Sequence, residues 1–344
     1  MSNKPIRVLL LTDDKPGHYN RAEGLVAAIA RLRPVETRRL VVRRRSLVAS
    51  RVLQQLLNIG VSPAQVLRLG YGVGAQDVPE ADVVVSAGGE TLAANAAAAR
   101  MLNAPNIFYG TLRRLAPEWV RVVVVPEQSL ASKPNHLIAL PPSAIEPAPR
   151  SQAAPLFGPD HPPHLVGVLI GGDSGALRYR DGDWLNLAGF LRDGQKTLGT
   201  RWLITTSRRT SAHAADILSA LAADSSAGVE RFMAFGTPGA VPEILSRSDA
   251  ILVTDDSTSM IAEALSARLP VVGMAPDGCV HEKREESFRS LVTSKGWYRR
   301  LAFSQLGPDA FLSALAQVTP RRTSALDELA SALAERLPEL FEKG

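Results

Sequence analysis

Hydroxyl-bearing and acidic residues are concentrated in one short segment of the second half of the chain. Thr254-Asp255-Asp256-Ser257-Thr258-Ser259-Met260 follows an apolar run and precedes an alanine-rich helical pattern. The free backbone N–H groups of a helix N-terminus bind phosphate oxygens, and neighbouring hydroxyls add further donors. A helix cap needs only one hydroxyl or acidic residue, whereas six stand here in a row. The segment therefore predicts a diphosphate site that uses Ser257, Thr258 and Ser259.

A glycine-rich loop follows another apolar run. Gly171-Gly172-Asp173-Ser174-Gly175 comes directly after Leu165–Ile170. Glycine lets the backbone approach an oxygen-rich ligand closely, and successive N–H groups in such a turn form an anion-binding nest. A plain strand-to-helix turn is the alternative. We expect the loop to hold the same diphosphate through Gly171, Gly172, Ser174 and Gly175.

Two other residue types suit a nucleotide diphosphate. Arg208 and Arg209 follow the apolar run Arg201–Thr205, and the planar guanidinium group matches phosphate oxygens. One of them is expected to face the ligand, with Arg208 as the candidate, while the other is solvated. Glu263 lies one to two turns into the helical pattern after Ser259. It can accept hydrogen bonds from a ribose diol, or it is an ordinary surface glutamate.

In the first half, a histidine and two acids follow the first apolar run. The segment Asp13-Asp14-Lys15-Pro16-Gly17-His18 comes after Ile6–Leu11. Because its pKa is close to neutrality, His18 can be a general base for an acceptor hydroxyl, although a lone histidine can also be structural. Asp13 and Asp14 can orient it, bind a metal or solvate the loop. We take His18 and Asp14 as catalytic candidates and place Gly17 on the acceptor side.

A second glycine pair follows the run Asp82–Ser86. In Ser86-Ala87-Gly88-Gly89-Glu90-Thr91, Gly88 and Gly89 are expected to face the acceptor. Glu90 is a further acid/base candidate, or a favourable charge at a helix N-terminus. The sequence has neither an HExxH helix nor paired CxxC motifs, so we expect no metal site.

Short apolar runs alternate with helical patterns along the whole chain. The runs are continuous rather than alternating, which is typical of parallel strands covered on both faces. The pattern predicts an α/β fold with two doubly wound Rossmann-like domains facing across a cleft. The expected strands are Ile6–Leu11, Val35–Val42, Asp82–Ser86, Asn106–Tyr109, Arg121–Val125, Leu165–Ile170, Arg201–Thr205, Ala250–Val253 and Pro270–Met274. The expected helices include Arg21–Arg33, Thr91–Leu102 and Thr258–Ala267.

The segment 141–163 is the clearest boundary, because eight of its 23 residues are proline and proline favours an extended linker. We expect an acceptor-side domain at 1–140 and a nucleotide-sugar-binding domain at 164–318. The remaining segment, 319–344, should contain a helix around Ser324–Phe341 that packs back on the body.

Several protein classes are disfavoured by the sequence. It has no GxSxG elbow, no GxGxxG after the first strand and no Walker A motif, which argues against a serine hydrolase, a dinucleotide oxidoreductase and a P-loop enzyme. We expect neither a signal peptide nor a membrane span. Cys279 is the single cysteine, so no disulfide forms within the chain and a cytoplasmic location fits. A nucleophilic role for Cys279 is the alternative to an inert thiol.

Positive charge is concentrated in the first half. Residues 1–140 hold 18 Lys and Arg against 10 Asp and Glu, within a net charge of +5 for the chain. Such a cluster attracts anions, including a membrane surface, or is a solvated face. No nucleic-acid motif and few aromatics accompany it, so we expect no nucleic-acid partner. The excess peaks at Arg38, Arg39, Arg43, Arg44, Arg45 and Arg51.

Taken together, the motifs resemble the mitochondrial fission factor family, which includes the plant elongated-mitochondria protein and bacterial relatives. The resemblance rests on Asp14-Lys15-Pro16-Gly17-His18 with Asn20 and Gly24, Ser86-Ala87-Gly88-Gly89, Ile170-Gly171-Gly172-Asp173, and Thr254 to Met260 with Glu263-Ala264. That family is similar to GT-B glycosyltransferases, such as the bacterial enzyme that adds N-acetylglucosamine to the peptidoglycan lipid precursor.

The resemblance implies that Gly171 to Gly175 and Ser257 to Ser259 hold the diphosphate, that Glu263 holds the ribose, and that His18 lies in the acceptor loop. The first loop departs from that enzyme's pattern because it lacks a doubled glycine before the histidine. The plant relative has a role in organelle division.

Three functional hypotheses follow. The first is a GT-B glycosyltransferase with a nucleotide-diphosphate-sugar donor, no obligatory cofactor, and a hydroxyl acceptor that is lipid-linked or part of a surface saccharide. It would work in the cytoplasm or peripherally on the inner face of the membrane, which the region from Arg38 to Arg51 would contact. The second is a non-catalytic, membrane-associated interaction protein. The third is a sugar-nucleotide epimerase or hydrolase on the same fold.

Overall fold

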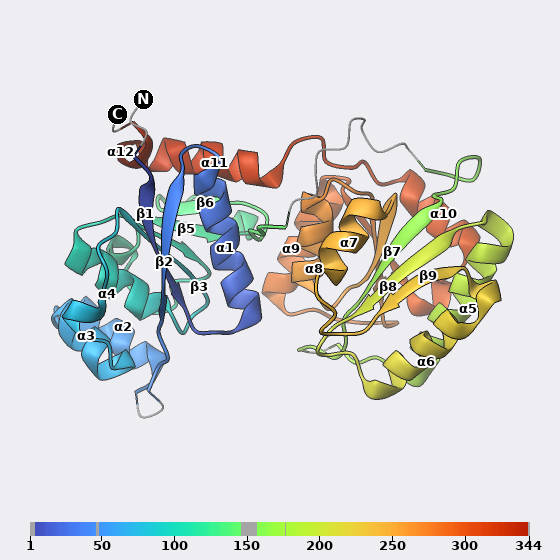
Figure 1. The fold of residues 1–344 in the computed structure, drawn as a ribbon, viewed down its shortest axis with the longest axis horizontal. Coiled ribbons are helices and arrows are strands. Elements are labelled where there is room, and N and C mark those ends of the chain that lie inside the picture. The colour runs from blue at the N-terminus through green and yellow to red at the C-terminus, as the bar shows by residue number, and fades with distance from the viewer. Residues whose placement is uncertain (1–3, 46–47, 146–156, 176, 343–344) are drawn as a thin grey trace. The chain divides into compact units, whose positions relative to one another are not determined.

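The computed structural model describes residues 4–45, 48–145, 157–175 and 177–342 (Figure 1). The chain forms two compact units, one of residues 1–144 with 325–344 and one of residues 145–324. Each unit has its own six-stranded parallel sheet with helices on both faces, which confirms the predicted pair of doubly wound α/β units. Part of the predicted linker, residues 146–156, lies outside the described residues.

The sheet of the first unit has the strand order β2-β1-β3-β4-β5-β6, and all neighbours pair in parallel. Its inner strands are continuous apolar runs because helices cover both faces. Edge strand β2 instead exposes polar side chains. The strands are β1 (Ile6–Thr12), β2 (Val35–Val41), β3 (Val83–Ala87), β4 (Asn106–Tyr109), β5 (Val122–Val125) and β6 (His136–Ile138).

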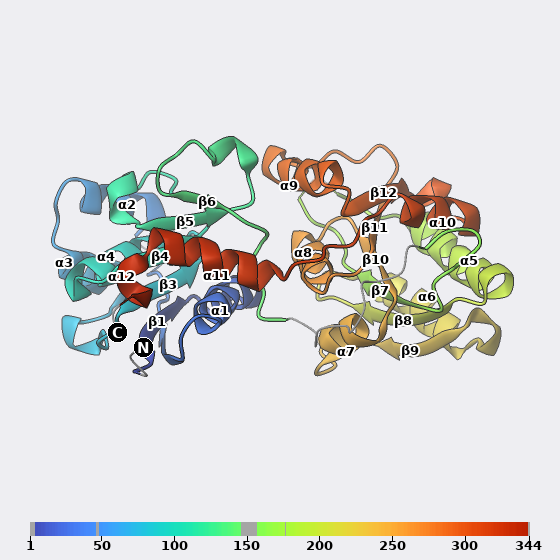
Figure 2. The same cartoon turned by 90° about the horizontal axis from the view of Figure 1, so that it is seen from above.

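Two helical layers enclose this sheet. One face packs on α1 (Pro16–Ala30) and on α11 (Ala325–Arg336) from the end of the chain; Figure 2 shows α11 lying along the sheet. The other face packs on α2 (Ser50–Asn58), α3 (Pro63–Tyr71) and α4 (Leu92–Leu102).

Two predicted helices have different bounds in the structure. Helix α1 begins at Pro16 rather than Arg21, since proline suits the first helical position. The predicted final helix is interrupted before Pro338, which has no N–H to continue it, and α12 (Pro338–Phe341) follows.

The sheet of the second unit has the order β12-β11-β10-β7-β8-β9, again parallel throughout. The strands at its two edges, β9 and β12, were not predicted because their charged residues mask the apolar pattern. The first unit's β6 was not predicted because it has only three residues. The strands of the second unit are β7 (Leu165–Ile170), β8 (Arg201–Thr206), β9 (Val229–Met233), β10 (Ala250–Thr254), β11 (Val271–Ala275) and β12 (Tyr298–Ala302).

The helices of this unit also form two layers (Figure 2). One layer shares the main apolar core with the sheet and consists of α5 (Asp181–Leu198), α6 (Ala212–Ala223) and α10 (Pro308–Ala316). The other layer consists of α7 (Ala240–Arg247), α8 (Thr258–Ser266) and α9 (Lys283–Ser294).

Because the strands of each sheet are parallel, the loops that follow them gather at one edge. In the first unit these are the loops after β1, β2, β3 and β4. In the second unit they are the loops after β7, β8, β10 and β11. Among the described helices, none combines the length and the apolar character needed to cross a bilayer.

Candidate functional site

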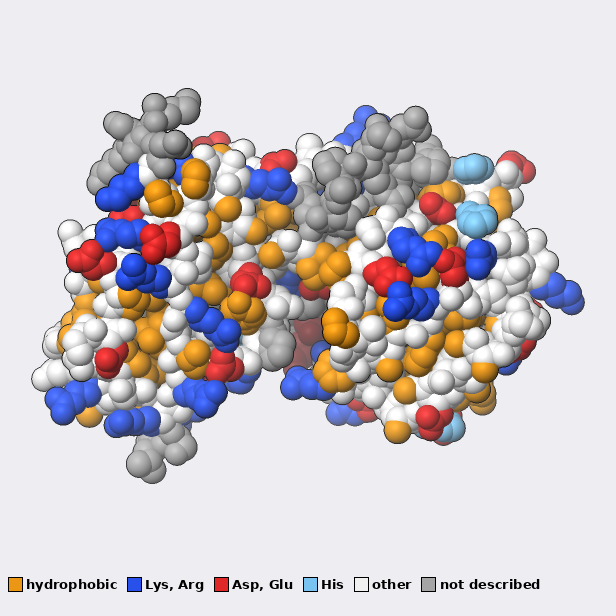
Figure 3. Space-filling model, viewed as in Figure 1, with side chains coloured by type: hydrophobic (Ala, Val, Ile, Leu, Met, Phe, Trp, Pro, Cys, Tyr) orange, Lys and Arg blue, Asp and Glu red, His pale blue; other side chains and the backbone are white. Residues whose placement is uncertain are grey.

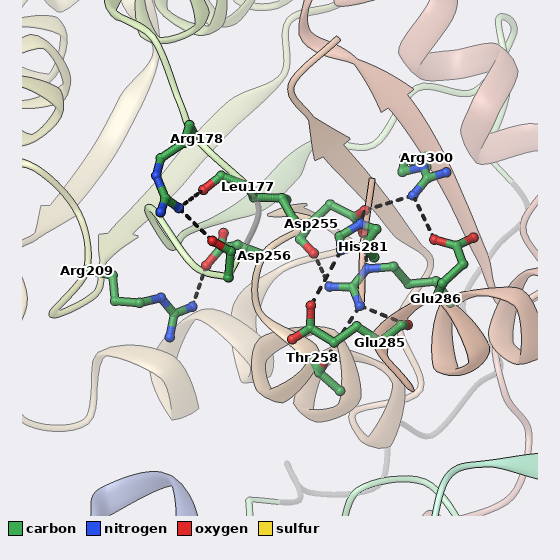
Figure 4. Close-up of polar contacts among 12 residues, drawn as sticks. Leu177, Arg178, Arg209, Asp255, Asp256, Thr258, His281, Glu285, Glu286 and Arg300 are labelled. Atoms are coloured by element: carbon green, nitrogen blue, oxygen red, sulfur yellow. Dashed lines mark hydrogen bonds and ion pairs between the residues drawn. The ribbon is translucent and has the colours of Figure 1, made fainter. Parts of the chain in front are cut away.

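Strand β10 ends in a carboxylate that is fully buried among cationic groups. Asp255 has no exposed surface, yet its side chain lies among four donors, several of which Figure 4 shows. The ring Nε2 of His281 lies 2.5 Å from Oδ2. The other donors are Arg289 Nε at 2.9 Å, Arg300 Nη1 at 3.2 Å and the hydroxyl of Tyr298.

This arrangement sets the charge states around Asp255. Burial alone would raise the pKa of its carboxyl, but the hydrogen bond from His281 and the charge of Arg289 outweigh burial and lower that pKa. Burial alone would lower the pKa of His281, but its hydrogen bond to Asp255 and its ion pair with Glu285, 3.6 Å from Nδ1, raise that pKa. Burial and the Asp255 charge both raise the pKa of Tyr298. The network therefore holds a charged carboxylate in the interior, with positive charge on three sides.

The neighbouring acid, Asp256, has a separate pair of partners. Arg209 donates to Oδ2, and the hydroxyl of Tyr179 donates to Oδ1 at 2.9 Å. The side chain of Asp256 is fully buried. Thus each of the two consecutive acids after β10 binds an arginine and a tyrosine, and both acids act as anchors for the loops around them.

The predicted glycine loop is fitted to this network. A Cβ on Gly171 would lie 2.2 Å from both carboxylate oxygens of Asp256, and a Cβ on Gly172 would lie 2.0 Å from the backbone oxygen of Arg209. The N–H of Gly171 also donates to Thr254 Oγ1 at 2.6 Å. Both glycines are therefore required for packing within the unit. A Gly172→Val variant would distort the loop and is a poor probe of ligand binding.

The N-terminus of α8 lies beside Asp255 and Asp256. Ser257 Oγ accepts the N–H of Met260 at 3.3 Å, so this serine is the N-cap. Thr258 Oγ1 accepts a hydrogen bond of 3.4 Å from Arg289, which links the helix to the Asp255 network. The first amides of a helix have no acceptor within it. The network thus fixes the direction in which the amides of this first turn point.

The other predicted diphosphate ligands differ in accessibility. Ser174 is half-buried and Gly175, at a left-handed φ of 56°, is exposed. Arg208 is exposed, while its neighbour Arg209 binds Asp256. Glu263 is buried, with 7% of its surface exposed. The structure brings Gly171, Gly172 and Ser257 to one sheet edge. That these residues contact a ligand stays a prediction.

A cavity of about 360 Å³ opens beside this edge, between the loops after β7 and β11. Burial raises the pKa of the Cys279 thiol there, which opposes formation of the thiolate. Two arginines and two aspartates line the cavity, so its charged side chains balance. It is lined by Arg178, Arg180, Asp183, Asp277, Gly278 and Cys279, among others.

Asp255, Cys279 and His281 form a group with metal-ligand chemistry. Their ligand atoms lie within 4.8 Å of one another. A divalent cation would compete there with Arg289 and Arg300, which already neutralise the single carboxylate. We therefore interpret the group as part of the ion-pair network.

In the first unit, the candidate His18 lies against the second glycine pair. Its Nδ1 lies 2.9 Å from Oδ2 of Asp13, and a Cβ on Gly88 would lie 2.3 Å from the same ring nitrogen. Gly88 has a φ of 89°. The loops after β1 and β3 therefore meet at the imidazole, and Asp13 rather than Asp14 orients it.

The other two catalytic candidates are held in ion pairs. Asp14 accepts hydrogen bonds from Arg39 at 2.5 Å and from Arg43 at 2.8 Å. The bond from Arg43 lowers the pKa of Asp14 and outweighs the opposite effect of burial. Glu90 accepts Arg44 Nε at 2.5 Å. Both carboxylates are thus charged partners of the arginine-rich segment, and their catalytic roles stay predictions.

Arg113 is a residue of this edge that the sequence interpretation missed. It follows β4 and has a left-handed φ of 53°. Its guanidinium lies over Gly89, 2.3 Å from where a Cβ would be. Its place in a loop directly after a predicted strand was the sequence signal that could have identified it.

Comparison with known families is decisive for the classification. A model of the mitochondrial fission ELM1 family matches residues 16–337. The chain belongs to this family. A comparison with curated proteins finds no match.

Three solved structures illustrate what this ELM1-family chain is similar to. A provisionally assigned UDP-N-acetylglucosamine 2-epimerase from Listeria monocytogenes is 11% identical, with 99% of this chain and 98% of the other covered and a TM-score of 0.55. S. aureus MnaA in complex with UDP is 12% identical, with 98% and 97% covered and a TM-score of 0.53. The calicheamicin glycosyltransferase CalG4 is 13% identical, with 98% and 95% covered and a TM-score of 0.50.

At sequence identities this low, the similarity to these structures establishes the fold of the chain and nothing further. The chain has the α/β architecture of GT-B glycosyltransferases and the related epimerases, as the resemblance of its motifs predicted.

Proposed function

We propose that this ELM1-family protein is a GT-B glycosyltransferase that binds a nucleotide-diphosphate sugar in its second unit. The observation that carries the proposal is the anchored N-terminus of α8. Asp255 and Asp256 fix this helix against the loops after β7, β8 and β11. A diphosphate bound there would accept hydrogen bonds from backbone amides and hydroxyls and would lie near the exposed Arg208.

The ligand class is supported by the similar structures, one of which is described in complex with UDP. In the proposed reaction an acceptor hydroxyl attacks the anomeric carbon, and the nucleoside diphosphate leaves with the bonding electron pair. The amides of the α8 N-terminus and the cations around them would stabilise the charge that develops on the leaving group. No obligatory cofactor is part of this proposal.

The first unit would bind the acceptor, a lipid-linked or surface saccharide, beside His18, Gly17, Gly88 and Gly89. His18, held by Asp13, would take the proton of the acceptor hydroxyl. The arginine-rich segment from Arg38 to Arg51 would bring this unit to an anionic membrane surface.

A sugar-nucleotide epimerase is the second candidate, because an assigned 2-epimerase is among the structures with a TM-score above 0.5. Epimerisation needs only the nucleotide sugar, whereas transfer needs an acceptor as well.

The test is thermal unfolding of the full chain with UDP, other nucleoside diphosphates and their sugars. Ligand at a hundredfold excess over Kd stabilises the protein by about 2.7 kcal/mol. We expect a shift with one nucleotide class, and loss of that shift in Arg208→Gln. Conversion of the sugar without an acceptor would favour the epimerase. Absence of any shift would contradict both enzymes and favour a non-catalytic interaction protein.

A further inference from the structure

The outer face of helices α2 and α3 combines exposed aliphatic side chains with arginine. Residues 37–76 contain seven arginines and no aspartate or glutamate. Four of the seven bind carboxylates that lie outside this stretch, on Glu36, Asp14 and Glu90. Arg45, Arg51 and Arg68 have no carboxylate partner among the described residues and are exposed. The face therefore carries an uncompensated positive charge.

Helix α2 has two apolar stripes rather than one. Its inner stripe, Leu53 and Leu57, is fully buried in the core of the first unit. Val52, Leu56 and Ile59 are spaced by four and three residues, so they form a second stripe about 100° around the helix from the inner one, and Leu56 packs against the edge of the same core. Val52 is 45% exposed and Ile59, at the C-cap, is 74% exposed.

Helix α3 extends this surface. Leu69 is 54% exposed and lies next to the exposed Arg68 in the chain. Arg51 similarly adjoins Val52. Figure 3 shows hydrophobic and basic side chains side by side on the part of the first unit formed by these helices. We name the set of Arg51, Val52, Ile59, Arg68 and Leu69 the α2–α3 face.

We propose that the α2–α3 face docks on an anionic lipid bilayer, with its aliphatic side chains inserted at the level of the headgroups. This pattern, an amphipathic helix with aliphatic residues flanked by arginine, is the one that binds in the plane of a membrane interface. Arginine is attracted to the negative surface of an anionic leaflet, and its aliphatic stem tolerates the interface. The inference refines the membrane part of the proposed function and does not depend on the reaction.

Two other occupants fit less well. A second copy of the chain would bring two acid-free arginine surfaces together across a twofold axis, and like charges would repel. A stable protein interface takes roughly 20–30 residues a side, whereas the exposed aliphatic residues here are Val52, Ile59, Leu69 and the half-buried Leu56. Shallow insertion into a bilayer needs only such a small apolar surface.

The experiment is co-sedimentation of the full chain with vesicles of phosphatidylcholine alone or mixed with phosphatidylglycerol. We expect binding to the anionic vesicles that weakens with salt. Arg51→Gln/Arg68→Gln should reduce the partition coefficient about 25-fold, at about fivefold per arginine. Val52→Ser/Ile59→Ser should reduce it at every salt concentration, because it removes the inserted groups.

Matched controls lie in the second unit. Lys196→Gln/Lys295→Gln removes the same charge, and Leu185→Ser removes a side chain that is 59% exposed. These should bind vesicles as the unaltered protein does. Equal binding by the α2–α3 variants and the controls would overturn the proposal. The proposal would also fail if Val52→Ser/Ile59→Ser left vesicle binding unchanged and altered the oligomeric state, measured by light scattering. The thermal shift with nucleotide, measured on the same variants, tests the enzyme proposal separately.

Discussion

The imidazole of His18 lies in the space where any side chain at position 88 would begin. A Cβ built on Gly88 would be 2.3 Å from Nδ1 of His18, the nitrogen that also binds Asp13. The glycine of the loop after β3 therefore determines where the histidine of the loop after β1 can stand.

We expect Gly88→Ala to displace the His18 ring and break its bond to Asp13. The φ of 89° at this position adds backbone strain, so the protein should lose about 1–3 kcal/mol of stability. The chemical shifts of the His18 ring protons, measured by NMR at one fixed pH, should change together with the stability. Unaltered ring-proton shifts in the variant would contradict the contact.

Gly17→Ala is the matched change on the same histidine loop. A Cβ at position 17 meets nothing within 4 Å, and the residue is helical in α1. Alanine there should stabilise the protein by about 0.5–1 kcal/mol. If Gly17→Ala lost as much stability as Gly88→Ala, the loop would tolerate no substitution. The effect of Gly88→Ala could then not be assigned to its contact with His18.

Asp255→Asn should be among the most destabilising single changes in the second unit. It leaves Arg289, whose side chain is 2% exposed, without its buried counter-charge. Breaking a buried pair in this way costs about 3–5 kcal/mol. Urea unfolding followed by tryptophan fluorescence is the measurement, since Trp184, Trp202 and Trp297 all lie in this unit. A loss below about 1 kcal/mol, the size of an exposed pair, would contradict the network.

The same network predicts opposite pH dependences for its two titrating members. The raised pKa of His281 contributes stability that is complete below its unfolded pKa of about 6.5 and is lost as the pH rises through the folded value. The lowered pKa of Asp255 contributes stability above about pH 3.9 that is lost as the pH falls through the folded value.

The free energy of unfolding is therefore expected to fall on the alkaline side because of His281. The difference between the unaltered protein and His281→Gln should be largest at mildly acid pH and should shrink as the pH rises through the folded pKa of His281. A difference that stays constant over this range would assign His281 a packing role alone.

Arg208 and Arg209 should separate ligand binding from stability. Arg208 is exposed and Arg209 binds the buried Asp256. Arg208→Gln should leave the melting temperature unchanged and weaken nucleotide binding by about 1.5–3 kcal/mol, the range of a hydrogen bond to a charged group. Arg209→Gln should lower the melting temperature even without ligand. The reverse pattern would reassign the phosphate contact to Arg209.

The sequence predicts the fold well where strands are inner and apolar. Asn106–Tyr109 and Leu165–Ile170 have the bounds that were expected, and the other inner strands differ by one residue at one or both ends. Edge strands such as β9 and β12 were missed because solvent on one side allows arginine and glutamate within them. Helix α2 was not predicted, because the arginines around it interrupt the apolar pattern.

The site is predictable only as a set of loops. The rule that ligands bind after parallel strands singled out the segments around His18, Gly88, Gly171 and Ser257. It could not show that Asp255 binds partners 26 to 45 residues further along the chain. Such pairing depends on the packing of β10, β11, β12 and α9, which no local pattern in the sequence encodes.

The return of the chain's last helix to the first unit has a consequence for biosynthesis. Leu333 and Leu337 are fully buried in the core that Leu25 and Ile29 of α1 form with one face of the sheet. On the ribosome, residues 1–144 emerge long before residues 325–344, so this part of the first unit's core stays open until residues 325–344 have been made. The second unit, continuous from 145 to 324, can close its core first. The first unit is therefore completed after the second, and its exposed apolar face in the interim is a natural client for a chaperone.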